Sequence, residues 1–276
     1  MESIAHFFKA VVYGIVQGVT EFLPVSSSAH LMLLPKFFGW AEPGNAFDMA
    51  LHLGTAVALI CFFFKDWMRL IIAGLTDAKS KNGRLFWTLV IATIPPAIIG
   101  LLFNDKVEGL QENALLVGIL LIAMGAVLYL ADRTGEKRID LAHMEPRKGI
   151  LIGASQVLAI IPGVSRSGIT MTTGRLLGVK RESIAKYSFL LSTPLMTADA
   201  LYSILKLKQH GMENLADVGG WFALLTGIVV SFVVGTLTIK FLLNLLKTKG
   251  FLCFAVYRFV LGGTVIVFSL LNLWPK

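Results

Sequence analysis

Residues 17–30 read QGVTEFLPVSSSAH and place a carboxylate, three consecutive serines and a histidine inside an otherwise strongly apolar run. Gln17 and Glu21 are four residues apart, so on a helix their side chains share one face. Pro24 ends that helix, because proline removes a backbone donor and clashes with the preceding turn. The serines then fall where a second helix begins, and there serine is a favoured cap. The stretch predicts two helices joined by a polar break.

The composition of the whole chain is that of a membrane protein. Its 276 residues are 55% hydrophobic and 15% charged, with a mean hydropathy of +0.74. Several windows of about 18 or more residues contain few or no charges, which is the length needed to cross a bilayer. The net charge of +8 comes mainly from short loops, where basic residues set orientation and do not indicate a nucleic-acid partner. We therefore expect an all-α polytopic membrane protein surrounded by membrane lipids.

Six apolar segments predict transmembrane spans: 47–64, 85–103, 114–131, 184–205, 221–243 and 252–273. Regions 8–40 and 149–179 instead contain short apolar stretches interrupted by Pro, Gly and Ser. Backbone that is not helical is tolerated at membrane depth only where protein or a water-filled cavity covers it. Both regions are interpreted as re-entrant helical hairpins, and two ordinary broken spans are the alternative.

The charges of the loops predict how the chain lies in the membrane. Loops 65–84 and 132–148 are rich in Lys and Arg, which places them in the cytoplasm. The segment 104–113 between them carries three acidic residues against one lysine and is expected outside. Both termini are then expected on the external side.

The two interrupted regions align without a gap when the sequence is shifted by 139 residues. Each half, 1–138 and 139–276, then contains one hairpin and three spans within a single membrane domain, 1–276. An odd number of crossings predicts an inverted repeat whose polar breaks meet near the midplane, where such folds bind their ligands. The identical pairs are Gly14 and Gly153, Gln17 and Gln156, Ser26 and Ser165, Ser28 and Ser167, and Gly39 and Gly178.

The second polar break is PGVSRSGIT, residues 162–170. Pro162 and Gly163 interrupt a helix, and Arg166 lies among hydroxyl residues at the start of the next. An arginine at membrane depth needs an anionic partner, and its planar fork suits phosphate or carboxylate. A purely structural salt bridge from Arg166 to Glu21 is the alternative interpretation.

Together the two breaks are suited to a phosphorylated ligand. Glu21, helped by the Gln17 carbonyl, is a candidate for holding a hard divalent cation through oxygen. Ser27 is a candidate nucleophile, His30 its proton carrier and Arg166 the ligand of the transferred phosphoryl group. The alternative is that the serines only cap a helix and Glu21 only bonds across helices. The other hydroxyls are predicted to bind the substrate: Ser26, Ser28, Ser165, Ser167 and Thr170.

These two motifs resemble the signatures of bacterial undecaprenyl-diphosphate phosphatases, and the similarity covers essentially the whole chain. The resemblance implies an enzyme of the bacterial cytoplasmic (inner) membrane that hydrolyses undecaprenyl diphosphate to undecaprenyl phosphate and inorganic phosphate. This reaction recycles the lipid carrier for peptidoglycan synthesis and confers bacitracin resistance. The resemblance also implies dependence on Mg²⁺ or Ca²⁺ and a site opening towards the external, periplasmic side. The family's essential residues fall on Glu21, Ser27, His30 and Arg166, and its supporting positions on Ser26, Ser165, Ser167 and Thr170.

One motif position departs from the commonest form, because Gln17 stands where some members have Glu. An amide offers a carbonyl oxygen but no charge, so we expect Glu21 to carry more of the cation binding. Asp48 and His52 are interpreted as interfacial polar groups, with an approach to the site as the alternative, and Arg258 as a residue that reaches to the cytoplasmic interface.

A different functional class remains open. A transporter or flippase of polyprenyl phosphate lipids would use the same architecture, with broken helices meeting at the midplane. The Ser27–His30 pair favours an enzyme, since a carrier needs no nucleophile. The sequence leaves the formation of a homodimer open.

Overall fold

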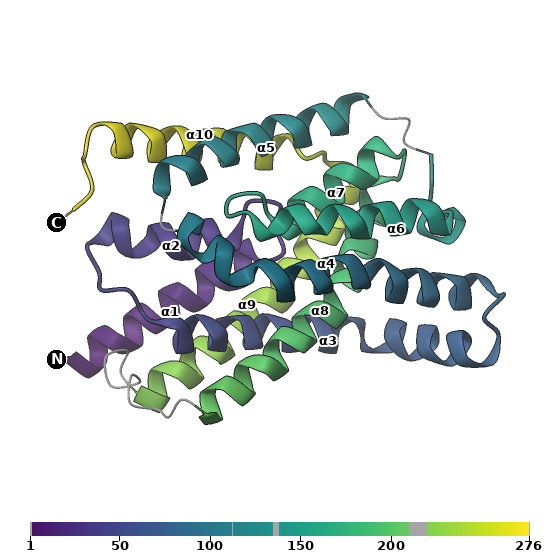
Figure 1. Ribbon diagram of the computed structural model, residues 1–276, viewed down its shortest axis with the longest axis horizontal. Helices are drawn as coiled ribbons and strands as arrows, with labels where there is room; N and C mark the ends of the chain where they lie inside the picture. Colours follow the sequence, from purple (N-terminus) through teal and green to yellow (C-terminus); the bar gives the residue numbers. More distant parts are fainter. Residues whose placement is uncertain (1, 112, 135–137, 210–219, 276) are drawn as a thin grey trace.

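The computed structural model describes residues 2–111, 113–134, 138–209 and 220–275, which form ten α-helices and two short 3-10 helices (Figure 1). The helices, in chain order, are α1 (Glu2–Thr20), α2 (Ser27–Phe38), α3 (Asn45–Thr76), α4 (Lys81–Gln111), α5 (Ala114–Thr134), η1 (Leu141–His143), α6 (Pro146–Ser155), η2 (Gln156–Ile160), α7 (Arg166–Leu176), α8 (Arg181–Gln209), α9 (Gly220–Thr248) and α10 (Leu252–Leu270). The all-α prediction is confirmed.

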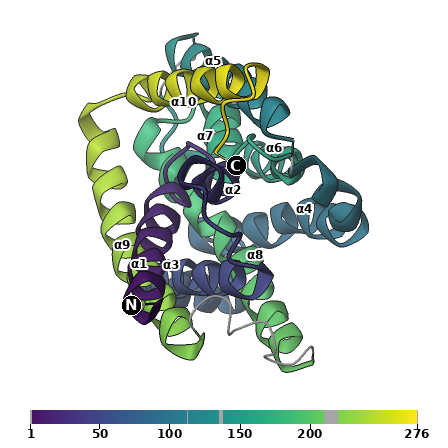
Figure 2. The ribbon, with the colours of Figure 1, turned by 90° about the vertical axis from the view of Figure 1, so that its left-hand side faces the viewer.

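Most of the long helices run along the longest axis of the molecule. In Figure 1, α1 begins and α10 ends at the same end of this axis, on the left, and the turn between α3 and α4 lies at the other end. Figure 2 looks from the left-hand end and shows α5 and α10 packed together along one edge, away from α3. The helix–break–helix unit of α1 and α2 therefore enters from one end, and that of α6 and α7 from the other.

Within the described residues, five helices are long and apolar enough to cross a membrane: α3, α4, α5, α9 and α10. The chain is therefore a polytopic membrane protein. The sixth predicted span, 184–205, does lie within one helix, α8, but that helix is less apolar than the other five. The reason is its position: α8 packs against α3, α4, α7 and α9. Its buried polar residues, such as Ser188, consequently face protein.

The predicted loop 65–84 is wrong, because most of it is helical. Helix α3 continues to Thr76 and α4 begins at Lys81. The connecting turn is closed by the Asp77 carboxylate, which accepts hydrogen bonds from the backbone N–H groups of Lys79 and Ser80. The predicted loop 104–113 likewise falls mostly within α4. Charged residues mark where a helix leaves the lipid, but they do not end the helix.

Both predicted breaks are present, and they share an unusual backbone conformation. Ser26 and Ser165, the residues that precede α2 and α7, have φ angles of 77° and 76°. A residue other than glycine rarely adopts a positive φ, so the surrounding contacts must hold these two serines in place. Helix α1 is longer than expected, since it begins at Glu2 and has 19 residues.

The helix that leads into each break packs on one long helix. Helix α1 packs on α9, and α6 packs on α4. Each contact includes a glycine at which the backbones come close. A Cβ at Gly14 would lie 2.8 Å from the Val230 Cβ, and one at Gly153 would lie 2.4 Å from the Ala92 carbonyl oxygen. Glycine thus permits the close approach of both helices that lead into the breaks.

A buried ionic cluster, which the sequence analysis missed, fixes the end of the molecule opposite α1. The Asp132 carboxylate of α5 accepts hydrogen bonds from Arg175 Nε at 3.0 Å and from Arg181 Nε at 2.8 Å. It also accepts one from the backbone N–H of Phe251, between α9 and α10. Arg175 is fully buried, and a buried charge of this kind strongly destabilises the fold when its partner is lost.

Candidate active site

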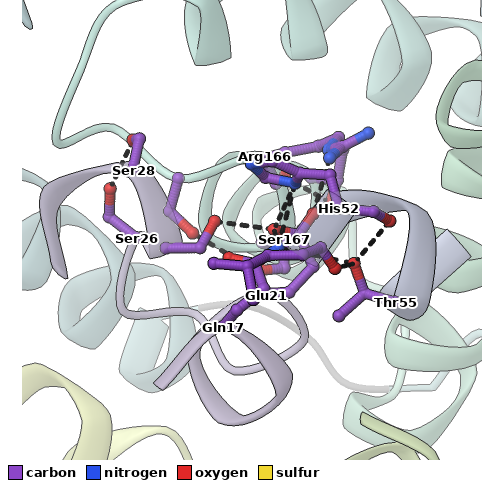
Figure 3. A network of polar contacts seen from close by, with 12 residues as sticks. Gln17, Glu21, Ser26, Ser28, His52, Thr55, Arg166 and Ser167 are labelled. Atoms are coloured by element: carbon purple, nitrogen blue, oxygen red, sulfur yellow. Dashed lines mark hydrogen bonds and ion pairs between the residues drawn. The ribbon is translucent and has the colours of Figure 1, made fainter. Parts of the chain in front are cut away.

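The two breaks meet in space, as predicted. Arg166, the first residue of α7, points its Nη2 at Glu21 Oε1 from a distance of 2.6 Å (Figure 3). A second link joins the Ser167 hydroxyl, which donates to the Leu23 carbonyl at 3.0 Å. Residues 145 positions apart in the chain are thereby brought into one polar network. The salt bridge between Arg166 and Glu21, which was the alternative interpretation, is present. Whether the pair could also take part in catalysis depends on the groups around it.

Glu21 is the centre of this network. Its Oε2 accepts a hydrogen bond from the Ser27 hydroxyl at 2.7 Å and one from Gln17 Nε2 at 3.1 Å. Its side chain is only 3% exposed, whereas that of Arg166 is 24% exposed. A carboxylate this deeply buried is tolerated because it is paired and hydrogen-bonded. The arginine keeps part of its surface available for a ligand.

His52 also belongs to the site, so its interpretation as an interfacial group is wrong. Its Nδ1 lies 2.9 Å from Gln17 Nε2, which makes Nδ1 the acceptor, and 3.6 Å from Glu21 Oε2. Thr55 lies one turn further along α3 and is 3.4 Å from the same amide nitrogen. The signal in the sequence was this pair of polar residues three positions apart on an apolar helix. It could be interpreted only once α3 was known to face α1.

The expected pairing of Ser27 with His30 is wrong. His30 Nδ1 lies 2.7 Å from the Ser26 carbonyl oxygen, and Nε2 lies 2.6 Å from the Tyr257 hydroxyl of α10. The hydroxyl of Ser27 instead donates to Glu21. Since the carbonyl can only accept, Nδ1 carries the proton and Nε2 accepts from Tyr257. Glu21 is therefore the basic group in contact with Ser27.

The remaining hydroxyls are engaged with protein. The Ser165 hydroxyl caps α7 by accepting from the Gly168 backbone N–H at 3.1 Å, and that of Thr170 lies 2.7 Å from the Ser188 hydroxyl of α8. Ser26 and Ser28 lie 3.3 Å apart, and Ser26 makes no side-chain cap on α2. The first backbone N–H groups of α2 are thus left for an anion. Substrate binding by these hydroxyls stays a prediction.

The sequence suggested that Arg258 reaches to the cytoplasmic interface, and this is wrong. The residue lies on α10 and is fully buried. Its guanidinium contacts both breaks through their backbone carbonyl groups. Tyr257, the preceding residue, contacts His30. This short stretch of α10 was not recognised as part of the site, because its partners lie more than 90 residues away in the chain.

The donors around Glu21 suit a cation that takes several ligands from its substrate. The described residues contain no cluster of three or more His, Cys, Asp or Glu able to hold a metal. The Gln17 carbonyl oxygen is, however, buried without a hydrogen-bond partner, while the nitrogen of the same amide contacts the Glu21 carboxylate. Mg²⁺ is commonly bound by one or two protein oxygens together with water and substrate phosphate. Glu21 and Gln17 carry oxygens of the type that such an ion takes.

Comparison with known proteins gives a single answer. Residues 10–264 match the family model described as bacitracin resistance protein BacA. An undecaprenyl-diphosphatase from Desulforudis audaxviator (strain MP104C) is 51% identical over 96% of this chain and 98% of its own length. One from Moorella thermoacetica (strain ATCC 39073 / JCM 9320) is 47% identical over 94% of this chain and 96% of its own length. The chain therefore belongs to the bacitracin resistance protein BacA family.

Proposed function

We propose that this chain is an undecaprenyl-diphosphatase, which hydrolyses undecaprenyl diphosphate to undecaprenyl phosphate and inorganic phosphate at the centre formed by Glu21, Ser27 and Arg166. One observation carries the assignment to these residues. A single buried carboxylate accepts a hydrogen bond from a serine hydroxyl at 2.7 Å and pairs with an arginine from the opposite break at 2.6 Å. A base, a nucleophile and a ligand for phosphate are thereby in contact. The names of the similar proteins support the same substrate.

In the first step, the Ser27 oxygen attacks the terminal phosphorus and forms a new P–O bond. Its proton passes to Glu21 Oε2, with which the hydroxyl is already hydrogen-bonded. The bridging P–O bond breaks, and its electron pair stays on the departing undecaprenyl phosphate. Water then attacks the phosphorus of the phosphoserine, and the P–O bond to Ser27 breaks. The Ser27 oxygen takes back the proton held by Glu21, the water protons stay with the released inorganic phosphate, and both residues are restored.

Two positively polarised groups hold the terminal phosphoryl group during this transfer. Arg166 uses one terminal nitrogen on Glu21 and presents the rest of its guanidinium fork to the phosphoryl oxygens. The first N–H groups of α2, which Ser26 leaves uncapped, begin at Ser27 itself and would bind the same oxygens. His30 fixes the Ser26 carbonyl and therefore the start of α2. Negative charge that develops on the phosphoryl oxygens is stabilised by groups that are already oriented.

The cation belongs to the same proposal. Glu21 and the carbonyl oxygen of Gln17 would hold Mg²⁺ or Ca²⁺. Of these two ligands, Glu21 is the negatively charged one. When bound, such an ion neutralises diphosphate charge and stabilises the departing phosphate. The support is the buried, unpartnered oxygen of Gln17, a residue whose amide group contacts Glu21.

Replacing Gln17 with glutamate should lower the cation concentration that gives half-maximal activity by about 10-fold, since ligand charge raises affinity for hard divalent ions. The second carboxylate would lie beside Glu21, and a bound cation would relieve their repulsion. The measurement is phosphate release at increasing Mg²⁺ or Ca²⁺ after chelation. Gln17→Ala, which removes the oxygen, should shift the half-maximal concentration upward. An unchanged cation requirement in both variants would show that Gln17 is not a ligand.

The same proposal includes the inverted repeat of residues 1–138 and 139–276, each with a re-entrant hairpin. Three observations support it. Helices α2 and α7 begin 139 residues apart, at Ser27 and Arg166, and α5 and α10 begin 138 apart, at Ala114 and Leu252. The pairing of α1 with α9 corresponds to that of α6 with α4 under this shift. The φ angles of Ser26 and Ser165 differ by only one degree.

We further propose that the site opens to the external side of the inner membrane. Basic side chains from α3, α8 and α9 gather around one recess of about 630 Å³, which also takes in η1. They include Arg69, Lys186, Lys240 and Lys247. Because cytoplasmic ends carry the excess of Lys and Arg, this end faces the cytoplasm. The unit of α1 and α2 enters from the opposite end (Figure 1).

Phosphate release by the purified chain in detergent tests the assignment directly. Undecaprenyl diphosphate with Mg²⁺ should give stoichiometric inorganic phosphate and undecaprenyl phosphate. In vesicles, the same preparation is assayed for movement of a polyprenyl phosphate between leaflets. Lipid movement without any phosphate release, by a protein shown to be folded, would reject the enzyme and favour the carrier.

A further inference from the structure

Arg258 of α10 is a buried cation with an unusual set of partners. Its side chain is 0% exposed, and none of the ion pairs within the described residues includes it. The guanidinium instead donates to four backbone carbonyl oxygens. These are Leu121 of α5 at 3.2 Å, Pro24 at 3.1 Å, Gly163 at 2.6 Å and Val164 at 3.2 Å.

Three of these carbonyl groups lie in the two breaks. Where a helix is interrupted, carbonyl groups lose the N–H partner that the next turn would supply. At membrane depth water is scarce, so another protein group must satisfy them. Pro24 precedes Ser27 by three residues, and Gly163 precedes Arg166 by three. One guanidinium thus binds the backbone at equivalent points, three residues before Ser27 and three before Arg166, and the side chains of both contact Glu21.

We propose that Arg258 is the positioning residue of this centre, which fixes the separation of the two breaks so that Ser27 and Arg166 both meet Glu21. This inference rests on the proposed function only for its effect on catalysis. Its structural part, the ordering of both breaks by one side chain, stands on the hydrogen bonds alone. Arginine suits the task because its rigid planar fork presents five donors in fixed directions. Its uncompensated charge also adds positive potential beside the phosphate-binding groups.

Neighbouring residues leave room for this guanidinium. A Cβ at Gly168, in the first turn of α7, would lie 3.0 Å from Arg258 Nη1. A Cβ at Gly125 of α5 would lie 3.1 Å from the Arg258 Cβ. Glycines on two different helices therefore allow α5 and α7 to close around Arg258. This packing agrees with a residue that holds several elements together.

The variants Arg258→Lys and Arg258→Gln separate charge from geometry. Lysine keeps the charge but offers three donors from one point, which cannot span carbonyl groups from both breaks and α5. Glutamine keeps part of the donor capacity without the charge. Arg175→Lys is the matched control, because Arg175 is equally buried but pairs with Asp132, away from the breaks.

The measurements are amide hydrogen exchange, thermal stability, kcat and KM of the full chain in detergent. In Arg258→Lys, amides in residues 21–28 and 161–168 should exchange at least about 10-fold faster, which reports local opening. Its kcat should fall about 100-fold, the loss expected when reacting groups shift by about 1 Å, while KM changes much less. Arg258→Gln should lose more kcat than the lysine variant. Arg175→Lys should lower the melting temperature while kcat and exchange in both breaks stay at wild-type values.

Wild-type exchange rates in both breaks of Arg258→Lys, or a kcat within a few-fold of wild type, would overturn the proposal. If exchange accelerates in both breaks but even the wild-type protein releases no phosphate, the positioning role holds and the proposed function fails. Gly125→Ala is a second variant for the case in which neither Arg258 variant folds. The added methyl group would contact the Arg258 Cβ closely and leaves the guanidinium present. Faster exchange in both breaks and a lower kcat are therefore expected, each smaller than in Arg258→Lys. Unchanged exchange and kcat in that variant would also overturn the proposal.

Discussion

Replacement of Glu21 with glutamine should lower kcat by about 10³-fold, which is within the range for loss of a general base. The amide has nearly the same shape, so the network around it can still form. It cannot, however, accept the Ser27 proton, and it provides no charge for a cation or for Arg166. Because Arg166 is then released to bind phosphate alone, KM should change far less than kcat. The measurement is steady-state phosphate release from undecaprenyl diphosphate at saturating Mg²⁺.

Glu182→Gln is the matched control for this experiment. Glu182 lies in the first turn of α8, is exposed, and lines the basic recess, away from the two breaks. Its replacement should leave kcat unchanged. A Glu21→Gln protein that is folded and retains more than about a fifth of wild-type kcat would contradict the role of Glu21, because loss of a general base costs at least 10²-fold.

Much of the architecture could be predicted because it depends on local patterns. Apolar segments of membrane-spanning length identified the helices, and Pro, Gly and Ser clusters identified the two breaks. The contact between Glu21 and Arg166 was also within reach, since a buried carboxylate and a buried arginine each need a partner. The lengths of the loops were harder to predict, because a charge at the bilayer edge is equally compatible with a helix that continues into water.

The site residues that were missed depend on distant contacts. Arg258 has the sequence context of a snorkelling arginine, and only the position of the breaks beside α10 shows that its partners are carbonyl groups. Spacing suggested that His30 would reach Ser27, because residues three apart share a helix face. At the first turn of α2 this fails: the Ser27 side chain turns back to Glu21, while His30 faces Tyr257. Every residue has a backbone carbonyl group, so the sequence does not indicate which of them will accept a hydrogen bond from a distant side chain.

The correction at His30 also changes the chemistry that can be expected. With Nδ1 on the Ser26 carbonyl and Nε2 on Tyr257, His30 has neither nitrogen directed at the serine it was to activate. In the proposed mechanism, Glu21 therefore acts both on the Ser27 proton and on the cation. This double use explains why Arg166 contacts the other oxygen of the same carboxylate, where it helps keep Glu21 ionised.

Ser27→Ala should likewise lower kcat by about 10³-fold, because the attacking oxygen is removed while binding by Arg166 and α2 remains. Ser183 is the matched control. It has the same side chain but lies in the first turn of α8, at the basic recess and away from the two breaks. Ser183→Ala should stay within a few-fold of wild type. A Ser27→Ala enzyme with near-normal kcat would remove Ser27 from the mechanism.

The stereochemistry at phosphorus decides what the Ser27 oxygen does. Attack by Ser27 followed by water is two in-line displacements, so a substrate made chiral at its terminal phosphorus with sulfur and oxygen isotopes should give product with retained configuration. A single attack by water that Ser27 only orients would invert the configuration. Acid quenching of the wild-type enzyme during its first turnover should also trap phosphate on Ser27, because phosphoserine survives acid. Inversion, together with a large loss in Ser27→Ala, would assign Ser27 to positioning water and leave Glu21 as the base for that water.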